Sequence, residues 1–164
     1  METAHDQIMA EIKLRLRNIS ARNGYFNSVK SLKRAMLTPF KGYDLPAVNF
    51  WSTGMLNADE GKYKKDDRNL TVMIEMHTKT WEPGAPFDSV AAKMAADIVT
   101  AINRSPNAPK VSDDLSPKLG GIVLQCKFDR YDNTIGEGQS PWVGVLVTFL
   151  VRFLADNHDM FNFK

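Results

Sequence analysis

The stretch that decides the fold runs from Trp142 to Leu154 and reads WVGVLVTFLVRFL. Valine or phenylalanine occupies every second position from Val143 to Phe153, and most of the alternate positions are also apolar. A period of two residues is typical of a β-strand. Because both faces are largely apolar, we predict a strand over 142–154 that is central in its sheet, or that has one face covered by another subunit. The run is shorter than the ~20 residues that a membrane-spanning helix needs.

The segment just before this strand shows a second alternation. Ile122, Leu124, Cys126 and Phe128 alternate with polar residues, which predicts a half-buried strand over 122–131. A polar turn then leads into the strand at 142–154, so we expect the two strands to form an antiparallel hairpin. Cys126 falls on the apolar face, which favours a packed core thiol over an exposed nucleophile.

Two more strands are expected earlier in the chain. The segment 70–81 alternates apolar residues with a polar set that includes Glu75 and His77, and a short run over 45–51 is rich in β-forming residues. The residues between these strands, 52–69, are rich in Gly, Asn, Asp and Lys and predict a loop or a hairpin tip. The segment 25–37 is interpreted as a modest strand or a turn region.

Two amphipathic segments predict helices, over 5–21 and 87–103. Thr3 and Asp6 resemble a capping box at the start of the first helix. The order of elements is helix, two or three strands, helix, two strands. We therefore predict an α+β fold in which an antiparallel β-sheet of four to five strands has two α-helices packed on one face. The 164 residues suit a single domain over 1–164, with 155–164 as a C-terminal tail.

The composition excludes several classes of protein. A single cysteine rules out an internal disulfide framework and a multi-cysteine zinc site. The 21 basic and 19 acidic residues are too balanced to indicate specific nucleic-acid binding. The N-terminus lacks the pattern of a signal peptide, so we expect a protein that is made in the cytoplasm and does not associate with membranes.

Residues that carry chemistry are sparse. The three histidines, at positions 5, 77 and 158, have no metal-ligand spacing. Glu75 and His77 point the same way from one strand, which fits either a general base oriented by a carboxylate or a solvent-facing pair on an open sheet. We favour the solvent-facing pair. No catalytic, cofactor-binding or metal-ligating residue is predicted.

Features that suit protein–protein contact are more plentiful. The loop 57–68 contains four acidic and four basic residues around Tyr63, and the tail 157–164 carries two phenylalanines and a methionine. Each also fits an ordinary role, as a mobile hairpin tip or as a lid on the sheet. Residues 1–44 hold eight basic and four acidic residues, a net charge of +4, whereas the remainder has a net charge of −2. This asymmetry fits head-to-tail self-association, although a solvated basic helix face explains it more simply.

Several segments of the sequence, and the order of its elements, resemble those of the tail terminator proteins of long-tailed bacteriophages, also called minor tail or tail completion proteins. The matching features are the N-terminal helix, the phrase Asp44-Leu45-Pro46-Ala47-Val48, the charged hairpin before Leu70-Thr71-Val72 and the helix near 87–103. The ending Gly138-Gln139-Ser140-Pro141-Trp142-Val143-Gly144-Val145 and its strand also match. The resemblance covers most of residues 5–154 and is one of layout, because the family has no short diagnostic motif.

The resemblance implies a virion structural protein of the tail or neck, present in the host cytoplasm during assembly. It implies a homo-hexameric ring that caps the last layer of the tail tube, ends tail polymerisation and offers a surface for head–tail joining. The implied partners are other copies of the chain, the tail tube protein, a head–tail connector protein and, in contractile tails, the sheath protein. No catalysis and no cofactor are implied.

The positions that we assign to partner contact follow from the charged loop, from the loop after the 70–81 strand and from the tail. Two alternatives stay open: another neck component, such as a head-completion or connector protein, and a small enzyme that uses Glu75 and His77. The candidate contact residues are Lys62, Tyr63, Lys64, Lys65, Trp81, Glu82, Met160, Phe161 and Phe163.

Overall fold

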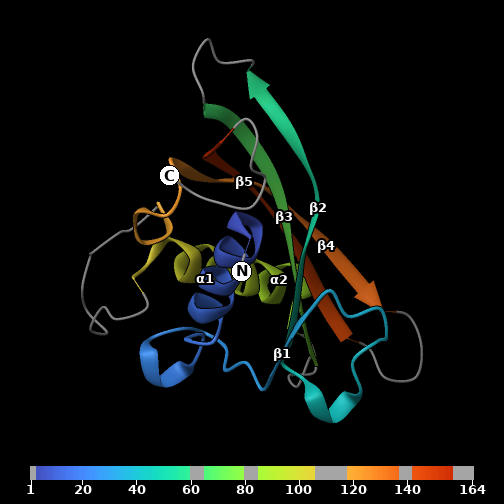
Figure 1. Cartoon of the computed structure of the whole chain (residues 1–164). Coiled ribbons are helices and arrows are strands. Elements are labelled where there is room, and N and C mark those ends of the chain that lie inside the picture. Colours follow the sequence, from blue (N-terminus) through green and yellow to red (C-terminus); the bar gives the residue numbers. More distant parts are fainter. Residues whose placement is uncertain (1–2, 60–64, 80–84, 106–117, 137–141, 157–164) are drawn as a thin grey trace.

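The computed structural model describes residues 3–59, 65–79, 85–105, 118–136 and 142–156, and Figure 1 shows its two helices beside one sheet. The helices are α1 (Ala4–Leu16) and α2 (Phe87–Asn103). The strands are β1 (Ser31–Arg34), β2 (Ala47–Asp59), β3 (Lys65–Lys79), β4 (Gln125–Gly136) and β5 (Trp142–Asp156). Short 3₁₀ turns occur at Ala21–Asn23, Gly42–Asp44 and Leu119–Gly121.

The five strands form one sheet in the order β1-β2-β3-β5-β4. β5 lies between β3 and β4 and is antiparallel to both, which confirms the central position predicted for 142–154 and its hairpin with the strand before it. β1 pairs with β2 in the parallel direction, so the sheet is mixed, and the predicted antiparallel arrangement holds for its other three pairings. Parallel neighbours need a crossover connection, and residues 35–46 supply it. The α+β class is confirmed.

Both helices lie against the same face of the sheet (Figure 1), which we call the covered face. Every second residue of β3 and β5 points into this layer, as the alternation predicted, and one apolar cluster joins these residues to α1 and α2. Burying such side chains contributes about 1.5–3 kcal/mol each before conformational entropy is counted. The fully buried members on the two strands are Leu70, Val72, Ile74, Met76, Val145, Val147, Phe149, Val151 and Phe153.

The second helix has the predicted bounds, but the first is shorter than predicted. Thr3 caps α1 by accepting a hydrogen bond from the backbone of Asp6 at 3.0 Å. The helix ends at Leu16 and not at residue 21, because the N–H groups of Asn18 and Ile19 bond to carbonyls three residues back, in tighter 3₁₀ turns. Ile19 still reaches the core from this turn, 1% exposed. The prediction extended the helix too far because Ile19 falls at helical spacing from the buried residues of α1.

The prediction that 52–69 form a loop or a hairpin tip was wrong for 52–59 and 65–69, which belong to two antiparallel strands. β2 continues to Asp59 and β3 begins at Lys65, so both strands run through most of the polar segment. A bulge between Ser52 and Gly54 shifts the register there, and Gly54 has a φ of 155° that suits glycine. Backbone hydrogen bonds to β5 extend along the whole of β3. These bonds stabilise the strand without an alternating side-chain pattern.

The other strand boundaries also moved. β2 begins at residue 47 rather than 45, and β5 extends beyond 154 to Asp156, which takes the first two residues of the predicted tail. β3 reaches 79, and the last two residues of the predicted strand, 80 and 81, lie outside the described residues. β4 begins at 125, not 122, because Leu119–Gly121 forms a turn with positive φ at both glycines. As a result Val123 is buried and Leu124 is 43% exposed, the reverse of the predicted alternation.

Candidate functional site

The face of the sheet opposite the helices, which we call the open face, is partly roofed by the crossover between β1 and β2. The side-chain amide of Asn49 holds this segment: it accepts a hydrogen bond from the Met36 N–H at 3.0 Å and donates one to the Met36 carbonyl at 3.1 Å. A cavity of about 350 Å³ lies between the crossover and the strands. Its walls are Met36, Leu37, Thr38, Pro39, Phe40, Leu45, Asn49, Glu75, His77 and Trp142.

Glu75 and His77 contact each other inside this cavity. His77 Nε2 lies 2.8 Å from Glu75 Oε1, and their side chains are 13% and 29% exposed respectively. The imidazole is flanked by the Phe40 ring and the Trp142 ring, with ring centroids 6.3 Å and 4.6 Å away, and it lies in a T-shaped arrangement with the indole. The pair is therefore enclosed by aromatic rings, and the expectation of a solvent-facing pair on an open sheet was wrong because the crossover covers that part of the sheet.

Glycine at position 144 allows the neighbouring side chains to lie close together over β5. Gly144 is paired with His77 of β3 on one side and with Thr134 of β4 on the other. A Cβ at this position would collide with Thr134 Oγ1, lie 2.9 Å from His77 Nδ1 and lie 3.0 Å from the Trp142 ring. The absence of a side chain here is what gives the imidazole and the indole their positions.

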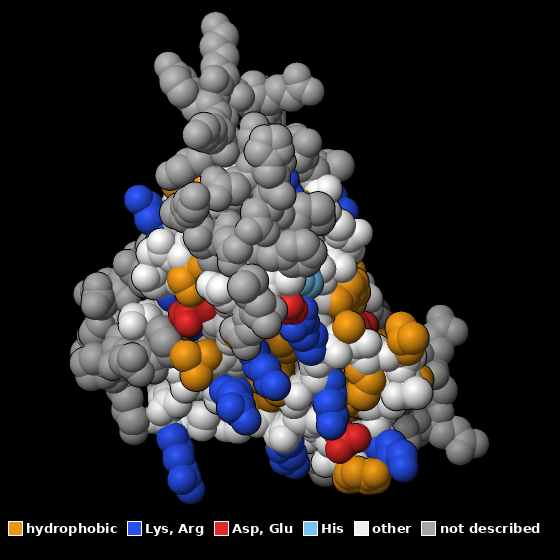
Figure 2. Space-filling model, viewed as in Figure 1, with side chains coloured by type: hydrophobic (Ala, Val, Ile, Leu, Met, Phe, Trp, Pro, Cys, Tyr) orange, Lys and Arg blue, Asp and Glu red, His pale blue; other side chains and the backbone are white. Residues whose placement is uncertain are grey.

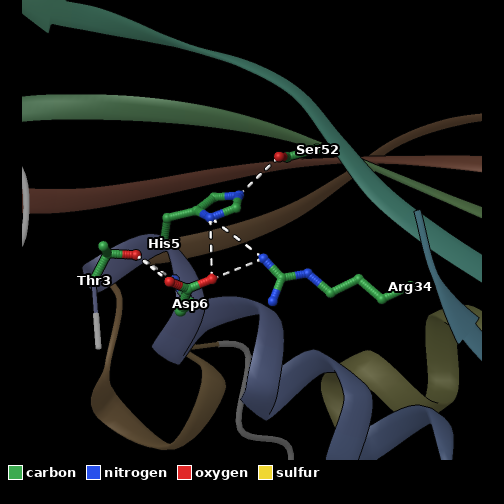
Figure 3. Close-up of polar contacts among 5 residues, drawn as sticks. All are labelled: Thr3, His5, Asp6, Arg34 and Ser52. Carbon is green, nitrogen blue, oxygen red and sulfur yellow. Dashed lines mark hydrogen bonds and ion pairs between the residues drawn. The ribbon is translucent and has the colours of Figure 1, made fainter. Parts of the chain in front are cut away.

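A second polar cluster joins α1 to the sheet on the covered face (Figure 3). His5 Nε2 lies 2.8 Å from Ser52 Oγ on β2, and His5 Nδ1 lies 3.7 Å from Asp6 Oδ1. Arg34 of β1 donates to Asp6 Oδ1 at 2.9 Å and lies 3.5 Å from His5 Nδ1. The hydrogen bonds from Thr3 and Arg34 hold the pKa of the Asp6 carboxyl below its usual 3.8. Sequence reasoning missed this cluster because 47 residues separate His5 from Ser52.

The Ser52–His5–Asp6 arrangement has the residue types of a nucleophilic triad but not its hydrogen bonding. In a triad the carboxylate accepts from Nδ1–H, which leaves Nε2 free to accept the serine proton. Here the Asp6 oxygens accept from Thr3 and Arg34, and the guanidinium beside Nδ1 can only donate. This environment favours the tautomer in which Nε2–H donates to Ser52. These contacts hold the N-terminal end of α1 against β1 and β2.

Cys126 is buried on the covered face, 4% exposed, as predicted. Burial raises the pKa of its thiol to about 12, partly offset by the positive charge of Arg15. A thiol with so high a pKa holds almost no thiolate at neutral pH, so it does not suit nucleophilic chemistry.

Two different surfaces lie at opposite edges of the sheet. At the β4 edge, Phe128 and Tyr131 are 37% and 43% exposed, because this strand runs beyond the helix layer (Figure 1). At the β1 edge, Lys13, Arg17 and Lys30 line a groove of about 350 Å³ between α1 and the segment that leads into β1. Figure 2 shows several Lys and Arg side chains gathered on the face that carries the helices.

Most of the predicted contact residues lie outside the described residues: Lys62, Tyr63, Lys64, Trp81, Glu82, Met160, Phe161 and Phe163. Lys65 is the first residue of β3, where its backbone is paired with Asp156 at the end of β5. The surfaces at Phe128, Tyr131 and the basic groove were not predicted. The sequence pattern does not distinguish an apolar residue of an edge strand that the helices leave uncovered from one that the helices cover.

Within the described ranges, no group of three or more His, Cys, Asp or Glu side chains is placed to hold a metal ion. Among the same residues, no helix combines the length and apolar character that crossing a bilayer requires. No protein-family model matches the chain, and no curated protein matches it.

Proposed function

We propose that this protein is a structural subunit of a bacteriophage tail: a tail terminator that assembles into a homo-hexameric ring. The ring caps the last layer of the tail tube, ends its polymerisation and offers the surface to which a head–tail connector binds. In a contractile tail, the sheath protein is a further partner. The proposal begins from the resemblance in layout between residues 5–154 and the tail terminator family.

The observation that carries the proposal is the pair of unlike surfaces at opposite edges of the sheet. A closed ring needs two different, complementary surfaces on each subunit, so that each copy contacts one neighbour with each surface. The strand order places the half-exposed aromatic residues of β4 at one edge and the basic groove beside β1 at the other. Aromatic residues and arginine are enriched in protein–protein interfaces.

The first experiment tests the ring itself. The purified protein is sized by light scattering over a range of concentrations and imaged by negative-stain electron microscopy. We expect hexameric rings for the wild type and monomers for the double variant Phe128→Glu/Tyr131→Glu, because two buried carboxylates would oppose the contact. Phe87→Glu is the matched control, since Phe87 is similarly exposed, at 45%, but lies at the start of α2, outside both proposed surfaces. Monomers alone for the wild type, without rings even beside tail tubes, would contradict the proposal.

A second experiment separates the tail terminator from its nearest alternative, another neck component. Such a protein also needs unlike surfaces for assembly, so oligomeric state does not discriminate between the two. The wild type is incubated with purified tail tubes and, separately, with head portals. We expect binding at one end of the tubes, whereas binding to the portals alone would assign the chain to the head side of the neck.

A further inference from the structure

The cavity on the open face has a polar floor and apolar walls. Among the described residues that line the cavity, Glu75 is the acidic one, and its contact with His77 uses Glu75 Oε1. Among the described residues, the interaction that the structure shows for this carboxylate is the one through Oε1. When the imidazole is neutral the pair carries one negative charge, which is partly shielded from water by the crossover. A partly desolvated carboxylate favours a cationic ligand.

The two aromatic rings in the cavity wall favour the same kind of ligand. Phe40 and Trp142 flank His77, and the negative faces of aromatic rings attract cations, most strongly when water is excluded. The rest of the wall, including Met36 and Leu45, is largely apolar. Such a wall fits an aliphatic stem that leads to the charged group.

The lysines nearest the cavity do not line it. A Cβ at Gly42 would lie 3.1 Å from the Lys79 ammonium, which therefore lies against the 3₁₀ turn that follows the lining segment. Lys41 in the same region extends over the Tyr43 ring at 5.8 Å. Neither ammonium is among the groups that form the cavity wall. Within the described part of the chain, the cavity wall therefore offers an anionic ligand the Glu75 carboxylate and no lysine.

We propose that this cavity binds a guanidinium or ammonium group carried on an apolar stem, with the Glu75 carboxylate as its partner and the Phe40 and Trp142 rings as its walls. His77 holds the carboxylate through Oε1, and Gly144 gives the imidazole room to do so. An arginine or lysine side chain of a polypeptide and a free alkyl cation share this chemistry.

The test uses three small probes on the wild-type protein: N-acetyl-arginine amide, agmatine and N-acetyl-citrulline amide. Citrulline has the shape of arginine without the charge. Binding is followed by NMR, through the His77 ring and Trp142 indole signals. We expect both cations to shift these signals saturably and the citrulline amide to bind about tenfold or more weakly. Equal binding of arginine and citrulline amides, or no shift with either cation, would overturn the proposal.

Two variants locate the carboxylate. Glu75→Gln keeps the shape of the side chain and removes its charge, and we expect it to weaken arginine amide binding about tenfold or more. Asp132→Asn removes the same charge from an exposed position on β4, where Asp132 pairs with Arg130 at 3.3 Å, and should leave binding unchanged. Unchanged binding in a folded Glu75→Gln protein would overturn the proposal. If Glu75→Gln does not fold, the arginine–citrulline comparison on the wild type decides.

The same probes distinguish the two sources of the cation. Arginine amide binding tighter than agmatine assigns the cavity to the side chain of a polypeptide, because the amide adds the backbone groups. Equal or tighter binding of agmatine assigns it to a free cation. Both results support the proposed site, and neither depends on whether the chain forms rings.

Discussion

The two faces of the sheet are made by the same strands, yet they have different surroundings. On the covered face, alternate residues of β3 and β5 pack against α1 and α2 in one apolar cluster. On the open face, the next residues along the same strands meet the crossover at one end and are partly exposed elsewhere, as at Leu150. The comparison shows that residue type alone does not separate the two faces of β5. What covers each face determines whether its apolar side chains stabilise the fold or remain available for contact.

The largest expected effect on stability comes from truncating one of two neighbouring side chains on β5. Phe149 is 1% exposed on the covered face and Leu150 is 40% exposed on the open face. We expect Phe149→Ala to lower the free energy of unfolding by about 3–5 kcal/mol. Leu150→Ala should lower it by less than about 1 kcal/mol. Urea denaturation of both variants measures the contrast, and equal losses would show that the open face is packed as tightly as the covered face.

The next effect tests the close packing over Gly144. A methyl group there collides with Thr134 Oγ1 and crowds His77, so we expect Gly144→Ala to cost about 1–3 kcal/mol. Adding Thr134→Ala removes the oxygen that the methyl strikes, an atom with no hydrogen-bond partner among the described residues. The double variant should recover part of the loss in the same denaturation assay. A double variant as unstable as Gly144→Ala would place the strain at His77 or Trp142 instead.

A smaller effect concerns acid stability. The Asp6 pKa is lower in the native state than its ordinary 3.8, so ionised Asp6 stabilises the native state above that pH. This contribution is lost as the pH falls through the lowered native pKa. We expect the melting temperature of Asp6→Asn to be below that of the wild type at neutral pH, and the difference to vanish at strongly acid pH. Thermal scans from about pH 6 to about pH 2 measure it, and a constant difference would contradict it.

The smallest expected effect concerns the Cys126 thiol, which should hardly react with a thiol reagent in the native protein. Cys126 is 4% exposed on the covered face, and burial raises the pKa of its thiol to about 12. Ellman's reagent at mildly alkaline pH should therefore react with the denatured protein but hardly at all with the native protein. Rapid modification of the native protein would mean that the covered face opens more readily than its packing indicates.

Strong periodicity was enough to predict most of the covered face. The stripe of α2 and the alternations of β3 and β5 predicted their elements because these residues contact one continuous core. The errors lie where backbone or turn chemistry outweighs side-chain pattern. One is at Ile19, which reaches the core from a 3₁₀ turn, and the other is at 52–59 and 65–69, where strand pairing includes polar residues.

The candidate cavity was predictable only in part. Glu75 and His77 were paired correctly from their spacing of two residues on one strand. Their enclosure was not, because it depends on Asn49 holding the backbone of Met36 and on Phe40 reaching His77 from the crossover. Such contacts between distant segments leave no local signal, although a polar Asn49 between Val48 and Phe50 does mark a position that differs from its neighbours.

The central position of β5 has a consequence for how the chain folds during synthesis. Each strand that flanks β5 precedes it in sequence, so β3 and β4 leave the ribosome before the strand that joins them. Until residues 142–156 emerge, both flanking strands present unpaired backbone groups along an edge, the type of surface on which nascent chains aggregate. Closure of the sheet is therefore a late event between segments distant in sequence, and a ribosome stalled before β5 would hold an unfinished sheet.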